Sequence, residues 1–240
     1  MISEVNIREV KKSGISIIPD FLNLQECEAA ISEIDRVIME HKDLVSIDKY
    51  GCDHRVYGFE YLSKYIQDKL LLNTSVLDAL SKLYKVNTVA CTLLGQLVKG
   101  STSNNGSGAS WHRDSLPSQY KAFCFLTKVT DNSGAFEYYP GSHTILNKAS
   151  SFFAHGTNLD YTNINNKKLS IKKKSIPKKL VCEPGTLVIL DTSSIHRGSP
   201  NALYSRYSFT YYAFAKVIPP HIDKVSKSSF MKASTKMGTS

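Results

Sequence analysis

The sequence predicts a mainly β protein with flanking helices, in which short strands form a barrel or a sandwich. Helix-like patterns are concentrated before residue 85, and short apolar segments separated by turn residues follow from residue 87. The chain of 240 residues is long enough for one sizeable core, and all-β domains of this length are common. We therefore predict a single domain over residues 1–218 with an N-terminal helical buttress.

The N-terminal part predicts one strand and two helices. The segment GISIIPDFL, residues 14–22, is typical of a short strand that stops near Pro19. Asn23 is a helix N-cap, and Glu26 stands at the third helical position, which completes a capping box. Apolar residues then recur at helical spacing and predict a buried face: Cys27, Ala30, Ile31, Ile34, Val37 and Ile38. Residues 74–84 predict a second amphipathic helix.

Apolar segments after residue 87 predict the strands. They are TVACTLLGQLV, YKAFCFLTKV, PGTLVILD and RYSFTYYAF, with a shorter strand inside DNSGAFEYYPGSH. The Gly/Ser-rich segment 99–108 is either a lid or an ordinary loop, and the Lys-rich segment 145–179 is an insertion or a helix with loops. The basic tail 219–240 has little apolar surface to bury, so we expect it to be flexible.

Composition excludes several classes of protein. No apolar run approaches the length needed to span a membrane, and the first fourteen residues lack the apolar segment of a signal peptide. We therefore expect a cytoplasmic protein that has no membrane partner. The five cysteines are odd in number, scattered and without a CxxC pair, which argues against a disulfide framework or a zinc ribbon.

The net charge of +9 is unevenly distributed. Seven lysines crowd residues 167–179, and five more lie between Lys216 and Lys236. The simpler interpretation is a solvated loop and a frayed terminus, and the sharper one is a rim that attracts an anionic substrate. Nucleic acid is disfavoured as a partner because aromatic residues are not interleaved with these lysines.

Three residues are candidate metal ligands. In the segment WHRDS, His112 and Asp114 point to the same side if the chain is extended. His196 follows a strong apolar strand and precedes a Gly-Ser-Pro turn, and it is the candidate third ligand. Two imidazoles and one carboxylate form the facial set of non-haem Fe(II) enzymes, which leaves positions open for a chelating cosubstrate and dioxygen. A structural zinc site would more often use cysteines and be closed.

A candidate carboxylate receptor lies one strand further on. Arg206 and Ser208 share a face of the predicted strand, and a guanidinium with a neighbouring hydroxyl suits a carboxylate. This arrangement favours a dicarboxylate oxo-acid that chelates the metal at its other end. Arg197 is the competing anchor, but both it and Arg113 adjoin a ligand and should face the opposite way.

The segments WHRDS, GAFEYYPGSH and PGTLVILDTSSIHRGSP…RYS resemble the phytanoyl-CoA dioxygenase family of Fe(II)/2-oxoglutarate oxygenases, as does SGISIIPDFLNLQECEAA. The resemblance covers roughly residues 10 to 215. It implies a double-stranded β-helix, a cupin-like jelly roll, with helices packed on one side. It also implies that His112, Asp114 and His196 bind Fe(II), that Arg206 pairs with the distal carboxylate of 2-oxoglutarate, and that Ser208 is its hydroxyl neighbour.

The resemblance implies a dioxygenase that consumes O2 and 2-oxoglutarate and releases succinate and CO2. Because the ligand Asp114 is present, hydroxylation of a small metabolite is favoured over halogenation. One alternative is a jelly-roll binding module without turnover, which the intact triad argues against. A less favoured alternative is a nucleic-acid demethylase, since those enzymes carry a second Arg six residues after the first, where this chain has Tyr212.

Other residues near the expected site have two interpretations each. His143 in the PGSH segment is interpreted as a structural turn residue, and Trp111 as a wall of the barrel or pocket. Gln96 and Lys121 lie in predicted strands near the pocket. Each would contact substrate or 2-oxoglutarate, or would lie at the edge of the core.

Overall fold

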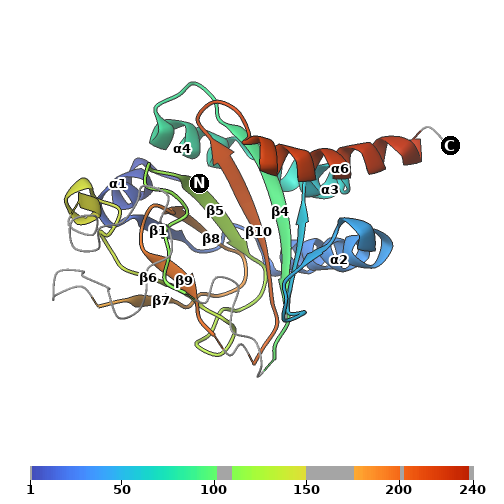
Figure 1. Ribbon diagram of the computed structural model, residues 1–240, viewed down its shortest axis with the longest axis horizontal. Helices are drawn as coiled ribbons and strands as arrows, with labels where there is room; N and C mark the ends of the chain where they lie inside the picture. The colour runs from blue at the N-terminus through green and yellow to red at the C-terminus, as the bar shows by residue number, and fades with distance from the viewer. Residues whose placement is uncertain (1, 102–109, 150–175, 201–202, 238–240) are drawn as a thin grey trace.

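The computed structural model describes residues 2–101, 110–149, 176–200 and 203–237, and it has two antiparallel sheets (Figure 1). The larger sheet has seven strands in the order β1-β8-β5-β10-β4-β3-β2. The smaller sheet has the order β7-β6-β9. In chain order the strands are β1 Ile15–Ile18, β2 Ser46–Ile47, β3 Asp53–Tyr57, β4 Ala90–Val98, β5 Tyr120–Phe125, β6 Phe136–Tyr138, β7 Lys178–Leu180, β8 Thr186–Asp191, β9 His196–Gly198 and β10 Arg206–Phe214.

The helices pack against the outer face of the large sheet and share one hydrophobic core with it. This core joins Ile34 and Leu80 of the helices to Leu93 and Tyr211 of the central strands. The helical elements are α1 Glu4–Ser13, α2 Leu24–Glu40, η1 Lys42–Leu44, η2 Phe59–Tyr61, α3 Lys64–Ile66, the π-helical turn η3 Gln67–Leu71, α4 Thr74–Tyr84 and α6 Pro220–Met237. The predicted capping box of α2 is present, because Glu26 N donates to Asn23 Oδ1 and Asn23 N donates to Glu26 Oε2.

Alternation along the strands separates the outer face of the large sheet from its inner face. In β5, Ala122 and Cys124 join the helix-side core, whereas Phe123 and Phe125 pack with the small sheet. In β8, Leu187 and Ile189 face the helices, and Val188 and Leu190 face inward. In β10 the outward residues include Phe209 and Tyr211, and the alternate residues are polar: Arg206, Ser208, Thr210 and Tyr212. The space between the sheets therefore combines an apolar floor with a line of polar side chains.

The C-terminal segment differs from the expectation of a flexible tail. Residues Pro220–Met237 form helix α6, which packs against η2 and β3. The helix attaches through small hydroxyls: Ser229 Oγ donates to Tyr57 O at 2.6 Å, and Ser226 Oγ lies 3.3 Å from Thr92 Oγ1. Both serines are buried. Because these attachments are polar, the sequence of this helix lacks the apolar stripe from which an amphipathic helix is predicted.

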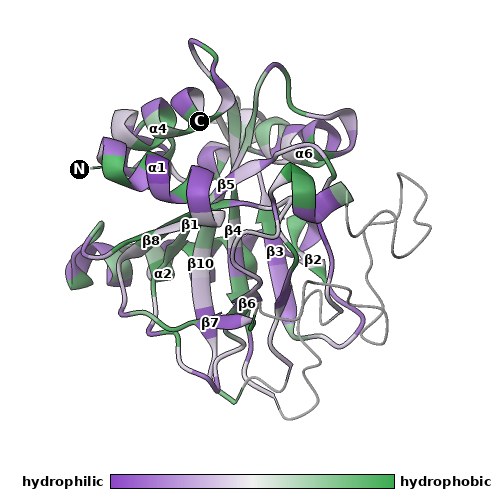
Figure 2. Ribbon diagram, turned by 90° about the vertical axis from the view of Figure 1, so that its left-hand side faces the viewer, coloured by the Kyte–Doolittle hydropathy of each residue, from purple (hydrophilic) through white to green (hydrophobic). Residues whose placement is uncertain are grey.

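Two sequence predictions lie mainly outside the described residues. Most of the candidate lid, 99–108, and five of the seven clustered lysines belong to those parts of the chain. The other two, Lys178 and Lys179, are on β7, which Figure 2 shows as hydrophilic. Within the described ranges, no helix has the length and apolar character required to cross a membrane.

We expect replacement of Gly95 by alanine to destabilise the fold by about 1–3 kcal/mol, through overpacking. Gly95 lies on β4 against an edge-to-face pair of rings, Phe59 and Phe209, whose centroids are 4.9 Å apart. A Cβ at Gly95 would lie 2.8 Å from Phe59 Cε2 and 3.2 Å from Phe209 Cε1. Urea unfolding measures the effect. Adding Phe59→Leu should recover part of the loss relative to the sum of the single changes, and strict additivity would contradict the steric explanation.

Candidate metal centre

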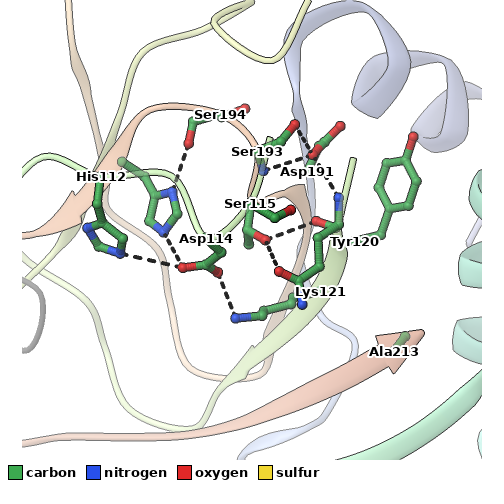
Figure 3. Close-up of polar contacts among 12 residues, drawn as sticks. His112, Asp114, Ser115, Tyr120, Lys121, Asp191, Ser193, Ser194 and Ala213 are labelled. Atoms are coloured by element: carbon green, nitrogen blue, oxygen red, sulfur yellow. Dashed lines mark hydrogen bonds and ion pairs between the residues drawn. The ribbon is translucent and has the colours of Figure 1, made fainter. Parts of the chain in front are cut away.

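The structure brings His112, Asp114 and His196 together. Figure 3 shows the side chains of His112 and Asp114 directed toward each other. One candidate ligand atom from each residue lies within 4.8 Å of the others. Asp114 Oδ1 lies 3.5 Å from His112 Nε2 and 3.6 Å from His196 Nε2. The two imidazole rings have centroids 4.4 Å apart. One carboxylate oxygen and two imidazole nitrogens therefore face a common point.

Backbone pairing places these three side chains. His112 and His196 form an antiparallel bridge, in which each backbone N donates to the other residue's O at 2.9 Å. Asp114 N donates to Thr192 O at 3.0 Å. The WHRDS segment is therefore aligned along the chain that enters β9, although only His112 of that segment forms a β-bridge. Alternation around this bridge puts His112 and Asp114 on one side, as the sequence predicts for an extended chain.

Both histidine rings are oriented by backbone carbonyls. His112 Nδ1 donates to Ser110 O and His196 Nδ1 donates to Ser194 O, each at 2.9 Å. A proton held at Nδ1 leaves the Nε2 lone pair directed at the common point. The ring of His196 also stacks on Phe136, with centroids 5.1 Å apart.

The electrostatics favour the ligand forms of Asp114 and His196. Burial alone would raise the pKa of Asp114, but the hydrogen bond with His112 and the charge of Lys121 outweigh it and hold the pKa well below its ordinary value. Burial lowers the pKa of His196 to about 4, so its ring is neutral near pH 7. For His112, burial is outweighed by the hydrogen bond with Asp114, and the pKa is raised. The cluster combines an ionised carboxylate with a neutral buried imidazole.

This donor set fits Fe(II). Imidazole and carboxylate are ligands that suit iron, and three of them leave other coordination positions for a cosubstrate and dioxygen. The Nδ1–carbonyl hydrogen bonds are the outer-shell support that metal-binding histidines require. Of the triad, Asp114 lines a cavity of about 460 Å³, whose lining also includes Tyr84, Gln119, Lys121, Tyr212 and His221.

Arg206 lies on the inner face of β10 as a partly buried cation, and no residue that the structure describes forms an ion pair with it. Its guanidinium donates to Gly134 O and lies over the ring of Phe125, 5.7 Å from the centroid. In the described part of the chain, Arg206 forms no ion pair and its buried Nε has no hydrogen-bond partner. Burial lowers its pKa, the direction expected when a cation is desolvated without a counter-charge. An incoming carboxylate would satisfy this group.

Ser208 shares the inner face of β10 with Arg206 but already has a partner. Its Oγ donates to Gln96 Oε1 at 3.4 Å, and Gln96 Nε2 donates to Asp53 Oδ1 at 2.7 Å. Asp53 in turn forms an ion pair of 2.7 Å with Arg55. The predicted role of Ser208 as a hydroxyl neighbour of 2-oxoglutarate therefore competes with an internal network.

The competing arginines have other partners. Arg197 Nε donates to Glu137 Oε2 at 2.7 Å, and its guanidinium lies over the ring of the buried Trp111. Arg113 donates to Ser142 O at 2.8 Å and to Ser193 O, and so braces the turn that leads to His196.

His143 is also engaged away from the triad. Its Nε2 donates to Lys11 O at 3.1 Å, which joins the PGSH turn to the end of α1.

Lys121 is the site residue whose role sequence reasoning missed. Its Nζ donates to Asp114 Oδ2 at 2.7 Å, and its side chain is 9% exposed (Figure 3). The sequence signal was a lone lysine in the apolar strand YKAFCF, which indicates that the side chain is directed to a specific partner. Only the fold shows that the partner is Asp114.

Comparisons with known proteins identify the family of this chain. The family model for phytanoyl-CoA dioxygenase (PhyH) matches residues 10–202. Among curated proteins, no sequence gives a significant match.

Several solved structures share the fold. The epimerase SnoN in complex with Fe3+, alpha ketoglutarate and nogalamycin RO has a TM-score of 0.68 and 15% identity, over 92% of this chain and 88% of that one. EctD from S. alaskensis with bound Fe has a TM-score of 0.64 and 14% identity, over 88% and 76%. AviO1 from Streptomyces viridochromogenes Tue57 has a TM-score of 0.61 and 16% identity, over 90% and 96%.

These likenesses and the two facing sheets confirm the predicted jelly-roll fold. The family model covers well over half of the chain and includes His112, Asp114 and His196. The chain belongs to the phytanoyl-CoA dioxygenase family.

Proposed function

We propose that this chain is a non-haem oxygenase in which His112, Asp114 and His196 bind Fe(II) and Arg206 binds the distal carboxylate of 2-oxoglutarate. The family is one of Fe(II)- and 2-oxoglutarate-dependent enzymes. The observation that carries the proposal is the convergence of two oriented imidazoles on one carboxylate, Asp114, which also lines a cavity. The unpaired guanidinium of Arg206 on the inner face of β10 supports it. Ser208 and Gln96 form the polar edge of the cosubstrate site in this proposal.

Bound Fe(II) and 2-oxoglutarate supply the oxidation of an unactivated C–H bond by dioxygen, with succinate and CO2 as coproducts. The residues of the chain determine where this happens. Ser110 O and Ser194 O fix the ligand rings, and the ring of Phe136 covers one face of His196. The protein therefore contributes the orientation of the ligands, whereas the cofactor supplies the difficult chemistry.

We infer that a small-molecule substrate enters through the cavity beside Asp114. Lys121 of β5 and Tyr212 of β10 form the last residue pair at one end of the β5–β10 pairing, and both line the cavity. Arg206 lies six residues from Tyr212 on β10, which is roughly 20 Å along an extended strand. The cosubstrate and the substrate would thus approach the triad from different ends of β10. Because Lys121 is already paired with Asp114, the residues that line the cavity favour a substrate whose reacting end is polar and uncharged. An anionic group on the substrate would bind further from the metal.

Hydroxylation is the proposed outcome because Asp114 retains its place as a ligand. SnoN is described as an epimerase and SnoK as a carbocyclase, both alpha ketoglutarate dependent, so the same fold accommodates other outcomes. Product analysis distinguishes hydroxylation, which adds one oxygen atom to the substrate, from epimerisation, which leaves its mass unchanged.

The direct test measures metal binding, 2-oxoglutarate binding and succinate formation by the same protein. We expect one Fe(II) per chain under anaerobic conditions, 2-oxoglutarate binding that requires the metal, and succinate only after oxygen is admitted. A candidate substrate should increase the rate of succinate formation. Absence of both metal and 2-oxoglutarate binding would contradict the proposal. Tight binding of a small molecule without 2-oxoglutarate consumption would favour a binding module.

A further inference from the structure

The two oxygens of Asp114 have different partners. Oδ1 faces the metal-directed nitrogens, at 3.5 Å from His112 Nε2 and 3.6 Å from His196 Nε2. Oδ2 points away from them and accepts from Lys121 Nζ at 2.7 Å (Figure 3). A carboxylate that gives both oxygens to a metal occupies two coordination positions, and one whose second oxygen is held by an ammonium occupies one.

Lys121 is itself held in place. It lies on β5 opposite Tyr212 of β10, and its Nζ is 4.2 Å from the centroid of the Tyr212 ring. The side chain is almost fully buried, so its ammonium has given up most of its water and relies on the carboxylate and the ring. This environment fixes the position of the ammonium instead of leaving it to solvent.

We propose that Lys121 is a positioning residue that keeps Asp114 a one-oxygen ligand and thereby preserves the coordination positions needed by 2-oxoglutarate and dioxygen. The inference rests on the proposed function, because it requires a metal at the triad. Lys121 was also a candidate contact for substrate or cosubstrate. A substrate anion would have to displace the partly buried carboxylate of Asp114 from this amine, so the positioning role is the one that the contacts support.

The variant Lys121→Met tests the inference, since methionine resembles the lysine stem but has neither charge nor donor. Lys128→Met is the matched control, because Lys128 lies shortly after β5 and is 61% exposed in a surface pair with Glu183. The measurements are circular dichroism and thermal melting for folding, Co(II) titration followed by the visible spectrum, and 2-oxoglutarate affinity of the metal-loaded protein. The Co(II) spectrum reports coordination geometry and does not depend on turnover.

We expect Lys121→Met to bind Co(II) with one site per chain but with an altered spectrum, and to bind 2-oxoglutarate about 10- to 100-fold more weakly, the usual range for loss of an outer-shell partner. Lys128→Met should match the wild type in both measurements. A second variant, Lys121→Ala, leaves space beside the 460 Å³ cavity. Ethylammonium added to this variant should restore the wild-type Co(II) spectrum and 2-oxoglutarate affinity, whereas sodium at equal ionic strength should not.

Three results would overturn the inference. One is a Lys121→Met protein that matches Lys128→Met in spectrum and 2-oxoglutarate affinity. A second is a loss limited to substrate-stimulated turnover, which would make Lys121 a substrate contact. The third is a folded Lys121→Ala protein that ethylammonium does not restore. Failure of the proposed function is distinguishable, because the wild-type protein itself would then bind neither Co(II) nor 2-oxoglutarate.

Discussion

Replacement of His196 by alanine is expected to reduce metal affinity and iron-dependent succinate formation by more than 100-fold. His196 supplies one of the three converging ligand atoms, and its ring is fixed by the hydrogen bond to Ser194 O and by stacking on Phe136. Loss of a mere outer-shell partner typically costs about 10- to 100-fold in metal affinity or activity, so loss of a ligand should exceed that range. Because burial keeps the imidazole neutral near pH 7, no deprotonation of His196 precedes metal binding there.

The measurement is metal content and affinity of the purified variant, followed by oxygen-dependent succinate formation. The control is His143→Ala, which removes another buried imidazole, one that bonds Lys11 O and lies outside the triad. The control should lose stability but keep one metal per chain. Stoichiometric metal binding by His196→Ala, at wild-type affinity, would exclude His196 as a ligand.

Local signals explain why much of the fold was predictable. The capping box at Asn23 and the apolar repeat that follows it specify α2 through contacts within one helix. The strands β4, β5, β8 and β10 carry long apolar runs, and their edges coincide with turn residues. The candidate site was predictable from the order of three motifs along the chain: HxD, a late His and an Arg ten residues beyond that His.

Features that depend on distant partners were not predictable in this way. Helix α6 attaches through Ser226 and Ser229, and serine hydroxyls leave no hydrophobic period in the sequence. Helix α1 buries only Ile7 and Val10, too few positions to define a period. The pairing of Lys121 with Asp114 joins residues on different segments, so alternation along β5 indicates the direction of Lys121 but not its partner.

Replacement of Arg206 by methionine is expected to weaken 2-oxoglutarate binding by about 100-fold or more while leaving the stability of the metal-free protein unchanged or higher. Truncating one partner of a buried charge pair costs about 2–5 kcal/mol of binding, and each 1.36 kcal/mol is about tenfold. In the protein without 2-oxoglutarate, however, the partly buried guanidinium forms no ion pair with a described residue, and its buried Nε has no hydrogen-bond partner. Methionine removes this desolvation cost at the expense of one hydrogen bond to Gly134 O.

Arg197→Met is the control for Arg206→Met, and we expect the opposite result from it. Arg197 lies on β9 of the small sheet. Arg197 pairs with Glu137, whose side chain is 8% exposed, so its removal leaves a buried carboxylate without its arginine and should lower stability by about 1–3 kcal/mol. Its effect on 2-oxoglutarate affinity should be small. The two variants are compared by urea unfolding without 2-oxoglutarate and by the thermal shift that 2-oxoglutarate produces in the metal-loaded proteins. If Arg206→Met loses stability and keeps its 2-oxoglutarate shift, the buried guanidinium is a structural group; if Arg197→Met loses the shift instead, the carboxylate anchor lies on β9.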